Sequence, residues 1–252
     1  MTPSIYIPKP TAGIIDRVGV GRGLMADLLA ASPFDLITHD FVFMGDTMPA
    51  EIVTATNGTS AALTPTATTS RGLGLVTGTD DNGYAGIGTA LAFKGDLGVL
   101  AEFLLEIPST KTTLKFEAGL TDALGDAGAV NAKGAGPTTA TATDFAVFVH
   151  DTDDDANLAT VSAKGGTVVE NQDLVAVAGS DKLYLAVRAI DDNVEFFYAQ
   201  NQTRSLTRIG HGGGAGIEGG SALTPWVFAQ ARAGSASRTV TVLRMRVTGA
   251  LL

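Results

Sequence analysis

The run "FVHDTDDDANL" places four carboxylates among the five residues 151 to 155, which makes it the first candidate for chemistry. Asp151, Asp153 and Asp155 have the alternating spacing that begins an EF-hand calcium loop. That loop also needs Gly at its sixth position and Glu at its twelfth, and this sequence has Ala and Ser there. The sequence therefore predicts an acidic turn between two strands, assigns no metal ligand, and leaves a partial calcium contact open.

Glu102 and Glu106 are the carboxylates that we tested for glycoside hydrolysis. The reaction needs two carboxyl groups roughly 5 to 10 Å apart on either side of the bond. On one strand face these two lie about 13 Å apart, because a strand rises ~3.3 Å per residue. Sandwich-fold glucanases carry an acid between two such glutamates, and this chain has Leu104 there. The pair therefore does not predict a hydrolase.

The histidines and the glycine-rich motif carry no clearer signature. His39, His150 and His211 stand in separate contexts, without a G-x-S-x-G or H-E-x-x-H motif beside them. In "GVGRG", residues 19 to 23, the glycines follow i, i+2, i+4 rather than the i, i+2, i+5 of a dinucleotide loop. A Ser-His-Asp triad assembled in space stays open. We assign no catalytic, cofactor-binding or metal residue, expect no cofactor, and expect that the protein is not an enzyme.

Composition points to a β-protein and narrows the partners. Charged residues are 17% and hydrophobic residues 45% of 252, with 31 glycines, which suits many short strands and tight turns. The net charge of −9 opposes nucleic-acid binding, which depends on Lys and Arg. The sequence has no cysteine, no 18-residue apolar run and no signal-peptide pattern, so we expect no disulfide, no membrane partner and synthesis in the cytoplasm.

Period-2 patterns dominate from residue 36 onward. In "VLAEFLLEI" the residues Val99, Phe103 and Ile107 share one face, and in "TLKFEAGL" Lys115 and Glu117 point away from the apolar face. Gly, Asn, Asp and Pro clusters separate these runs, so the strands connect as hairpins and the fold is an all-β antiparallel two-sheet sandwich. The expected strands cover residues 36–44, 50–64, 71–77, 84–93, 99–107, 113–120, 144–149, 158–163, 167–170, 183–190, 193–200, 203–209, 222–231 and 238–249.

Four details refine this prediction. "LYLAVRAI" and "NVEFFYAQ" are joined by a short Asp-Asp-Asn turn and predict one hairpin. "RTVTVLRMRVTG" changes parity after Val242, which indicates a bulge, a strong twist or burial of both faces. Residues 121–143 and 210–221 are glycine-rich and predict peripheral loops. Trp226, the single tryptophan, is expected to pack in the core rather than to form an exposed sugar-binding plane.

The first 35 residues differ from the rest and predict an extended arm. Pro8 and Pro10 fix an extended path, and "GLMADLLAAS" is a short helix candidate. We therefore expect an arm at residues 1–35 and a sandwich domain at 36–252. The arm supplies the expected partner-binding residues, whose apolar side chains and main chain can add to a neighbour's sheet edge: Ile5, Tyr6, Ile7, Pro8 and Pro10.

The order of these elements resembles bacteriophage virion proteins with a concanavalin-A-like jelly-roll sandwich. The stretches that carry the resemblance are "GLVTGTDDNGYAGIGTALAF", "LLEIPSTKTTLKFEAGLTDA", "DFAVFVHDTDDDANLATVSAKGG", "YLAVRAIDDNVEFFYAQ" and "ALTPWVFAQARAGSASRTVTVLRMRVTG". The resemblance implies a virion protein, made in the host cytoplasm, that stabilises a phage capsid as a decoration (cement) protein. Its partners would be the major capsid protein or other virion proteins, and it would form a homo-oligomer. The alternative is a tail- or fibre-associated carbohydrate-binding module for host-surface glycans.

Overall fold

The computed structural model describes most of the chain from residue 36 onward. The arm predicted at residues 1–35, with Ile5, Tyr6, Ile7, Pro8 and Pro10, lies outside the described residues, so its boundary with the sandwich stays a prediction. The same holds for Asp155. The described ranges are 36–44, 47–65, 71–90, 92–124, 128–132, 138–153, 156–201, 207–211, 216–234 and 236–250.

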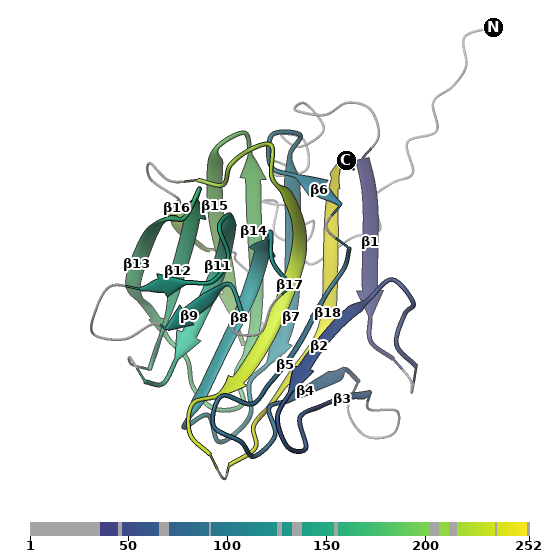
Figure 1. Ribbon diagram of the computed structural model, residues 1–252, viewed down its shortest axis with the longest axis vertical. Helices are drawn as coiled ribbons and strands as arrows, with labels where there is room; N and C mark the ends of the chain where they lie inside the picture. The colour runs from purple at the N-terminus through teal and green to yellow at the C-terminus, as the bar shows by residue number, and fades with distance from the viewer. Residues whose placement is uncertain are drawn as a thin grey trace, which may run out of the picture.

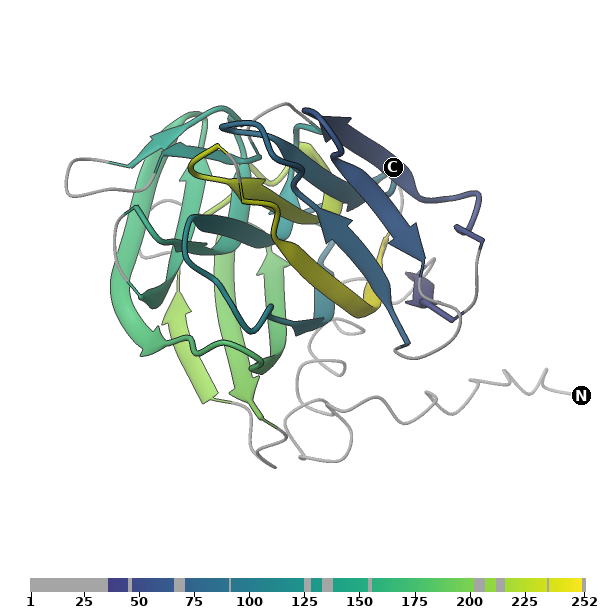
Figure 2. The ribbon, with the colours of Figure 1, turned by 90° about the horizontal axis from the view of Figure 1, so that it is seen from below.

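The prediction of an all-β two-sheet antiparallel sandwich is confirmed (Figures 1 and 2). Within the described ranges every pairing in the two sheets is antiparallel, and each sheet has eight strands. Sheet A consists, in order, of β16 (Thr207–His211), β15 (Asn193–Gln200), β14 (Lys182–Ile190), β7 (Val99–Glu106), β18 (Thr239–Ala250), β4 (Leu73–Val76) and β3 (Ala62–Pro65), with β1 (Leu36–Val42) also paired to β18. Sheet B consists of β13 (Thr167–Ala176), β12 (Asn157–Lys164), β11 (Phe145–Asp151), β8 (Leu114–Thr121), β17 (Ala222–Ala231), β5 (Tyr84–Gly88) and β2 (Val53–Asn57), with β6 (Phe93–Lys94) also paired to β17.

The main core lies between the two sheets. Alternate residues of each central strand point into it, as the period-2 patterns predict, because successive strand side chains point to opposite faces. Phe148 of β11 meets Phe196 of β15 across the interface, edge to face, with ring centroids 5.2 Å apart. The predicted inward residues of β7 and of the position after it are all buried in this core: Val99, Ala101, Phe103, Leu105 and Ile107.

The parity change in the last strand is a bulge. The register of β18 against β7 shifts between Val242 and Arg244, so that Leu243 is the additional residue. Because of this extra residue, Val242 and Met245 both face the core. The predicted hairpin of β14 and β15 is also confirmed, and its turn holds Asp191 at a φ of 51°.

Two segments that the sequence predicts as peripheral loops pack more closely than expected. Within residues 121–143, β9 (Val130–Ala132) and β10 (Thr139–Ala140) pair with each other, and Val130 is fully buried against Phe145 and Val147 of Sheet B. Within residues 210–221, Ile217 is fully buried in the main core. The apolar residues inside each glycine-rich stretch, rather than its average polarity, decide where it packs.

β1 forms one border of Sheet A (Figure 1). Its seven residues pair with the second half of β18, and no other described strand pairs with it. Arg244 donates from Nε to Oδ1 of Asp40 at 2.7 Å, which fastens the strand to its neighbour. Ile37 and Val42 on this strand are exposed.

Among the described residues no helix is long and apolar enough to span a bilayer.

Candidate functional site

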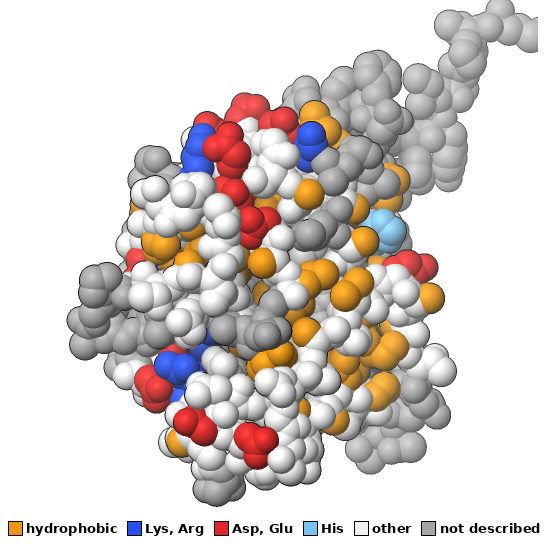
Figure 3. Space-filling view, viewed as in Figure 1, with side chains coloured by type: hydrophobic (Ala, Val, Ile, Leu, Met, Phe, Trp, Pro, Cys, Tyr) orange, Lys and Arg blue, Asp and Glu red, His pale blue; other side chains and the backbone are white. Residues whose placement is uncertain are grey.

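The outer face of Sheet B, which points away from the main core, holds the candidate functional site. It faces the viewer in Figure 1, and Figure 3 shows apolar side chains across its middle and mixed basic and acidic side chains toward its ends. Three aromatic residues of β5 and β17 form its apolar part: Tyr84, Trp226 and Phe228. The Tyr84 and Phe228 ring centroids lie 5.3 Å apart, and those of Trp226 and Phe228 lie 5.9 Å apart.

Trp226 is buried as predicted, but on the outer face rather than between the sheets. Its ring lies over the glycines of β5, since a Cβ placed on Gly86 would be 2.8 Å from Cη2 and one on Gly88 would be 3.1 Å from Cε3. Leu124 packs against the same cluster from the segment that follows β8. The indole is therefore not an exposed plane for a sugar ring.

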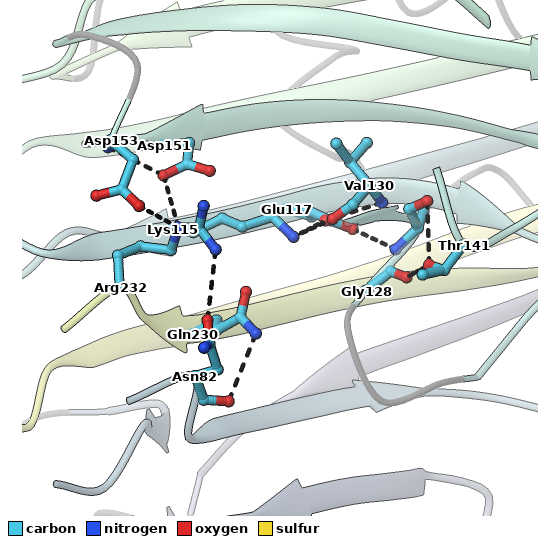
Figure 4. Close-up of polar contacts among 11 residues, drawn as sticks. Asn82, Lys115, Glu117, Gly128, Val130, Thr141, Asp151, Asp153, Gln230 and Arg232 are labelled. Carbon is cyan, nitrogen blue, oxygen red and sulfur yellow. Dashed lines mark hydrogen bonds and ion pairs between the residues drawn. The ribbon is translucent and has the colours of Figure 1, made fainter. Parts of the chain in front are cut away.

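Lys115 and Glu117 of β8 form a buried ion pair beside the aromatic cluster (Figure 4). They point away from the main core as predicted, yet both side chains have an exposed fraction of 0%, and Nζ lies 2.8 Å from Oε1. The Glu117 carboxylate accepts hydrogen bonds from the N–H groups of Ala129 at 2.7 Å and Val130 at 3.1 Å, while Lys115 donates to the Val130 carbonyl oxygen. The segment at 128–132 therefore covers the pair and removes its charges from solvent.

A row of polar side chains crosses the end of this face. Gln230 of β17 and Asp151 of β11 lie on either side of Lys115 in the sheet register, and we call these three residues the polar row. Arg232 lies next to the row: its Nε is 3.1 Å from Oδ1 of Asp151 and 3.1 Å from Oδ2 of Asp153. Figure 4 shows how the guanidinium connects these acids to the opposite side of the row.

Asn82 stands at that opposite side. Its Oδ1 accepts a hydrogen bond of 3.5 Å from Nη1 of Arg232, and its carbonyl oxygen accepts one of 3.4 Å from Nε2 of Gln230. Arg232 thus connects the polar row to Asp153 in the turn after β11 and to Asn82 in the segment before β5. Residues that are distant in sequence meet here because β8 pairs with both β11 and β17.

Two oxygen atoms of the polar row are buried and accept no hydrogen bond from the part of the chain that the structure describes. They are Oε1 of Gln230, a residue 4% exposed, and Oδ2 of Asp151, a residue 1% exposed. A buried acceptor without a donor costs ~1 to 3 kcal/mol, so such atoms in a folded protein indicate a missing partner. A hydrogen-bond donor satisfies either atom, and an ordered water, a ligand hydroxyl or a ligand ammonium group can supply it.

The expected acidic turn follows β11, with β12 returning and Gly165 and Gly166 making the next turn. Asp151 accepts the N–H of Asp153 at 3.1 Å, and both carboxylates lie against Arg232. A guanidinium therefore stands where a calcium loop would need a cation. Within the described ranges, no group of three or more His, Cys, Asp or Glu side chains is arranged to hold a metal ion.

Glu102 and Glu106 lie on Sheet A, on the other side of the molecule from the polar row. Glu102 is 5% exposed, accepts a hydrogen bond from the Tyr184 hydroxyl, and lies 3.4 Å from Nη1 of Arg246. Burial raises the pKa of Glu102, and the Tyr184 bond and Arg246 partly oppose that rise. Glu106 is exposed beside Lys182. The two glutamates therefore do not act as a pair.

The histidines of β1 and β11 also stand apart from the polar row. His39 stacks near Phe41, with centroids 6.0 Å apart. His150 is fully buried, packs against Phe116, and its Nδ1 lies 3.1 Å from the carbonyl oxygen of Asn157. The side chain of His211 lies outside the described residues. Both described histidines have packing roles in this fold.

Sequence reasoning missed Gln230, Arg232 and Asn82. The alternation in "PWVFAQAR" places Trp226, Phe228, Gln230 and Arg232 on one face, and that signal was present. The alternation does not show which residues lie next to these side chains on the adjacent strands. Gln230 and Asp151 lie beside Lys115 because of the pairing register between segments that are distant in sequence.

No protein-family model and no curated protein matches this chain. Solved structures do match it. A protein of unknown function from Shewanella oneidensis MR-1 has a TM-score of 0.64 at 13% identity, over 100% of this chain and 97% of that one. The chain has the concanavalin-A-like fold, because plant lectins and a glucanase of that fold also match most of it.

Plant lectins and a bacterial glucanase share this fold. Lectin II from Ulex europaeus, solved with galactose, has a TM-score of 0.53 at 10% identity over 85% of this chain and 99% of that one. A Bacillus licheniformis β-glucanase has a TM-score of 0.52 at 9% identity over 83% of this chain and 97% of that one. At these identities the likeness concerns the fold alone, so the site must be argued from this chain's own residues.

Proposed function

We propose that this protein binds carbohydrate at the polar row and does not transform it. The observation that carries the proposal is the pair of buried acceptors, Oε1 of Gln230 and Oδ2 of Asp151, which have no donor. Sugar hydroxyls are donors that can approach two separated acceptors from one rigid ring. The shared fold with a lectin solved with galactose supports the same ligand class.

The carboxylates around the site favour binding over catalysis. Glycoside hydrolysis needs one carboxyl group to protonate the leaving group and a second to act as nucleophile or base. Glu117 is engaged by Lys115 and two backbone N–H groups under the covering segment, and Asp151 is engaged by Arg232. Glu102 lies on the other sheet. We therefore propose a binding protein, although a glucanase shares the fold.

A glycan array followed by calorimetry on the full chain tests the proposal. We expect binding to at least one saccharide, and a loss of about tenfold or more in affinity for Asp151→Asn or Gln230→Leu, since a lost charge-assisted or neutral hydrogen bond is worth ~1 to 3 kcal/mol. Glu106→Gln is the matched control, because this exposed carboxylate of Sheet A is remote from the site. No bound saccharide, or binding that both site variants leave unchanged, would reject the proposal.

The capsid decoration role stays a prediction from resemblance. Its anchor, at Ile5 to Pro10, lies outside the described residues, and no described contact favours it over glycan binding. Deleting residues 1–35 and measuring co-sedimentation with capsids tests it, and full retention of binding by the truncated protein would contradict the anchoring role.

A further inference from the structure

We propose that the site selects saccharides that carry a free ammonium group, that is, amino sugars. This inference rests on the proposed carbohydrate-binding function and names its ligand class. The ammonium group replaces the Arg232 guanidinium between Asp151 and Asp153, and a hydroxyl of the same sugar donates to Gln230. Arg232 is then an internal competitor that occupies the site when no sugar is bound.

The hydrogen-bonding balance of the polar row excludes ligands that offer only acceptors. The Lys115 ammonium is already engaged by Glu117 and the Val130 carbonyl oxygen, so it is not available to a ligand. The polar-row atoms that lack partners, on Gln230 and Asp151, are both acceptors, and the indole Nε1 of Trp226, further along β17, is an unpartnered donor on the same face. A carboxylate brought to this row would face those acceptors and the Asp151 charge and gain no donor from them, so we expect an acidic sugar to bind through its hydroxyls alone and more weakly than an amino sugar.

The charge balance favours a cation over a neutral donor. Asp151 and Asp153 share one guanidinium, and Lys115 and Glu117 cancel each other, so the formal charge of these five groups is −1. The shared acids differ in access: the Asp153 side chain is 50% exposed and that of Asp151 is 0% exposed. A ligand ammonium can therefore approach from the Asp153 side and exchange with Arg232, which keeps the buried carboxylate of Asp151 paired throughout.

The spacing of the acceptors fits one sugar ring. Gln230 and Asp151 lie on β17 and β11, which are separated by β8 alone, so their backbones are about 10 Å apart at ~4.8 Å between neighbouring strands. Groups on opposite sides of a pyranose, with a hydrogen bond at each end, cover a comparable distance. In Figure 4 the amide oxygen of Gln230 points to the side on which the guanidinium of Arg232 lies. The Arg232 guanidinium bonds Oδ1 of Asp151, so the ammonium that replaces it has to donate to Oδ2 as well, while a hydroxyl at the other end of the sugar donates to Gln230.

Removing the internal competitor should strengthen binding. Arg232→Gln leaves Asp151 and Asp153 without their cation, and a ligand ammonium then binds without displacing a side chain. We expect affinity for amino sugars to rise about tenfold, as one charge-assisted contact is regained without exchange. Arg232→Lys keeps a competing cation, but a single ammonium holds the two carboxylates less firmly, so the affinity should rise less than in Arg232→Gln. Asp153→Asn leaves one acid for Arg232 and should weaken amino-sugar binding several-fold.

Calorimetry on the full chain, with matched sugars, tests the proposal. The probes are glucosamine and galactosamine, their N-acetylated forms, and glucuronate and galacturonate. We expect the amines to bind about tenfold more tightly than the N-acetylated sugars, the uronates to bind most weakly, and added salt to weaken the amines most. Trp226 fluorescence checks that each variant is folded. If Arg232→Gln does not fold, the exposed Asp153→Asn change still tests the charge balance.

Four results would overturn the inference. N-acetylated sugars binding as tightly as the amines would reject the ammonium preference and leave the carbohydrate function standing. Methylamine binding as tightly as glucosamine, per molecule, would show a simple cation site. Saccharides that bind without any response to Arg232→Gln or Asp153→Asn would place the sugar elsewhere, and binding of no saccharide at all would reject the proposed function together with this inference.

Discussion

The buried ion pair of Lys115 and Glu117 gives the most specific stability prediction, because each charge keeps different hydrogen-bond partners when the other is removed. Glu117→Gln removes the carboxylate that compensates the buried Lys115 ammonium, which keeps contacts to the Val130 carbonyl oxygen and to the Phe228 ring, whose centroid is 5.3 Å from Nζ. Breaking a buried pair by removing one partner costs ~3 to 5 kcal/mol. The amide of glutamine also presents one oxygen to two N–H donors, so we expect the upper part of that range.

Lys115→Met should cost less. The Glu117 carboxylate keeps the N–H groups of Ala129 and Val130 at 2.7 and 3.1 Å, and these compensate much of its charge. The losses are one charge-assisted bond and the donor to the Val130 carbonyl oxygen, which together suggest ~2 to 3 kcal/mol. The expected order of destabilisation is therefore Glu117→Gln above Lys115→Met, by about 1 kcal/mol or more.

Urea unfolding followed by the fluorescence of Trp226 measures both variants, since this single tryptophan is fully buried on the same face. The control is Glu106→Gln, which breaks an exposed pair whose side chains are 44% and 41% exposed and should cost less than ~0.5 kcal/mol. Equal costs for Glu117→Gln and Glu106→Gln, or a larger cost for Lys115→Met than for Glu117→Gln, would refute the reasoning.

Three further predictions concern packing, pH and loop anchoring. Gly86→Ala should destabilise the protein by ~1 to 3 kcal/mol, because its Cβ would press on the Trp226 ring. Gly220→Ala is the control and should change the urea midpoint little, since no atom lies within 4 Å of its Cβ position. Similar midpoints for both variants would contradict the prediction. Burial raises the pKa of Glu102, so the folded protein binds the carboxyl proton more tightly than the unfolded chain does. The free energy of unfolding should therefore fall as the pH rises from about 4.3 through the folded-state pKa, and Glu102→Gln should flatten that fall. An unchanged slope in the variant would count against this prediction. Asp144 accepts hydrogen bonds from the N–H groups of Gly165 at 3.0 Å and Glu218 at 2.9 Å. Asp144→Ala should therefore lower the free energy of unfolding by ~1 to 3 kcal/mol and speed hydrogen exchange at both N–H groups. Unchanged exchange there would show that other contacts hold these loops.

Local patterns were sufficient for the strands and their faces. The alternation of β7 placed Phe103 in the core, and the parity change near Val242 corresponds to a bulge. These features depend on a residue and its near neighbours in sequence, since a strand turns every second side chain to the same layer. For the same reason the hairpin around Asp191 was predictable from its turn residues.

The cover over the outer face of Sheet B was not predictable from such patterns. Alternation correctly placed Lys115 and Glu117 away from the core and wrongly implied that solvent would meet them there. Their burial depends on the segment at 128–132, which looks like a polar loop in sequence and supplies two N–H groups to one carboxylate. The candidate site was not predicted for a related reason: Gln230, Arg232 and Asp151 come together only through the order of strands in the sheet.

The border formed by β1 has a consequence for how the protein must be handled. A seven-residue strand that no other described strand pairs with, and that carries exposed Ile37 and Val42, is a template on which further β-structure can grow. Its one acidic side chain, Asp40, is committed to Arg244 and gives little repulsion against an incoming strand. Concentrated solutions should therefore be watched for fibrous aggregates, and Val42→Lys is the substitution that would discourage them.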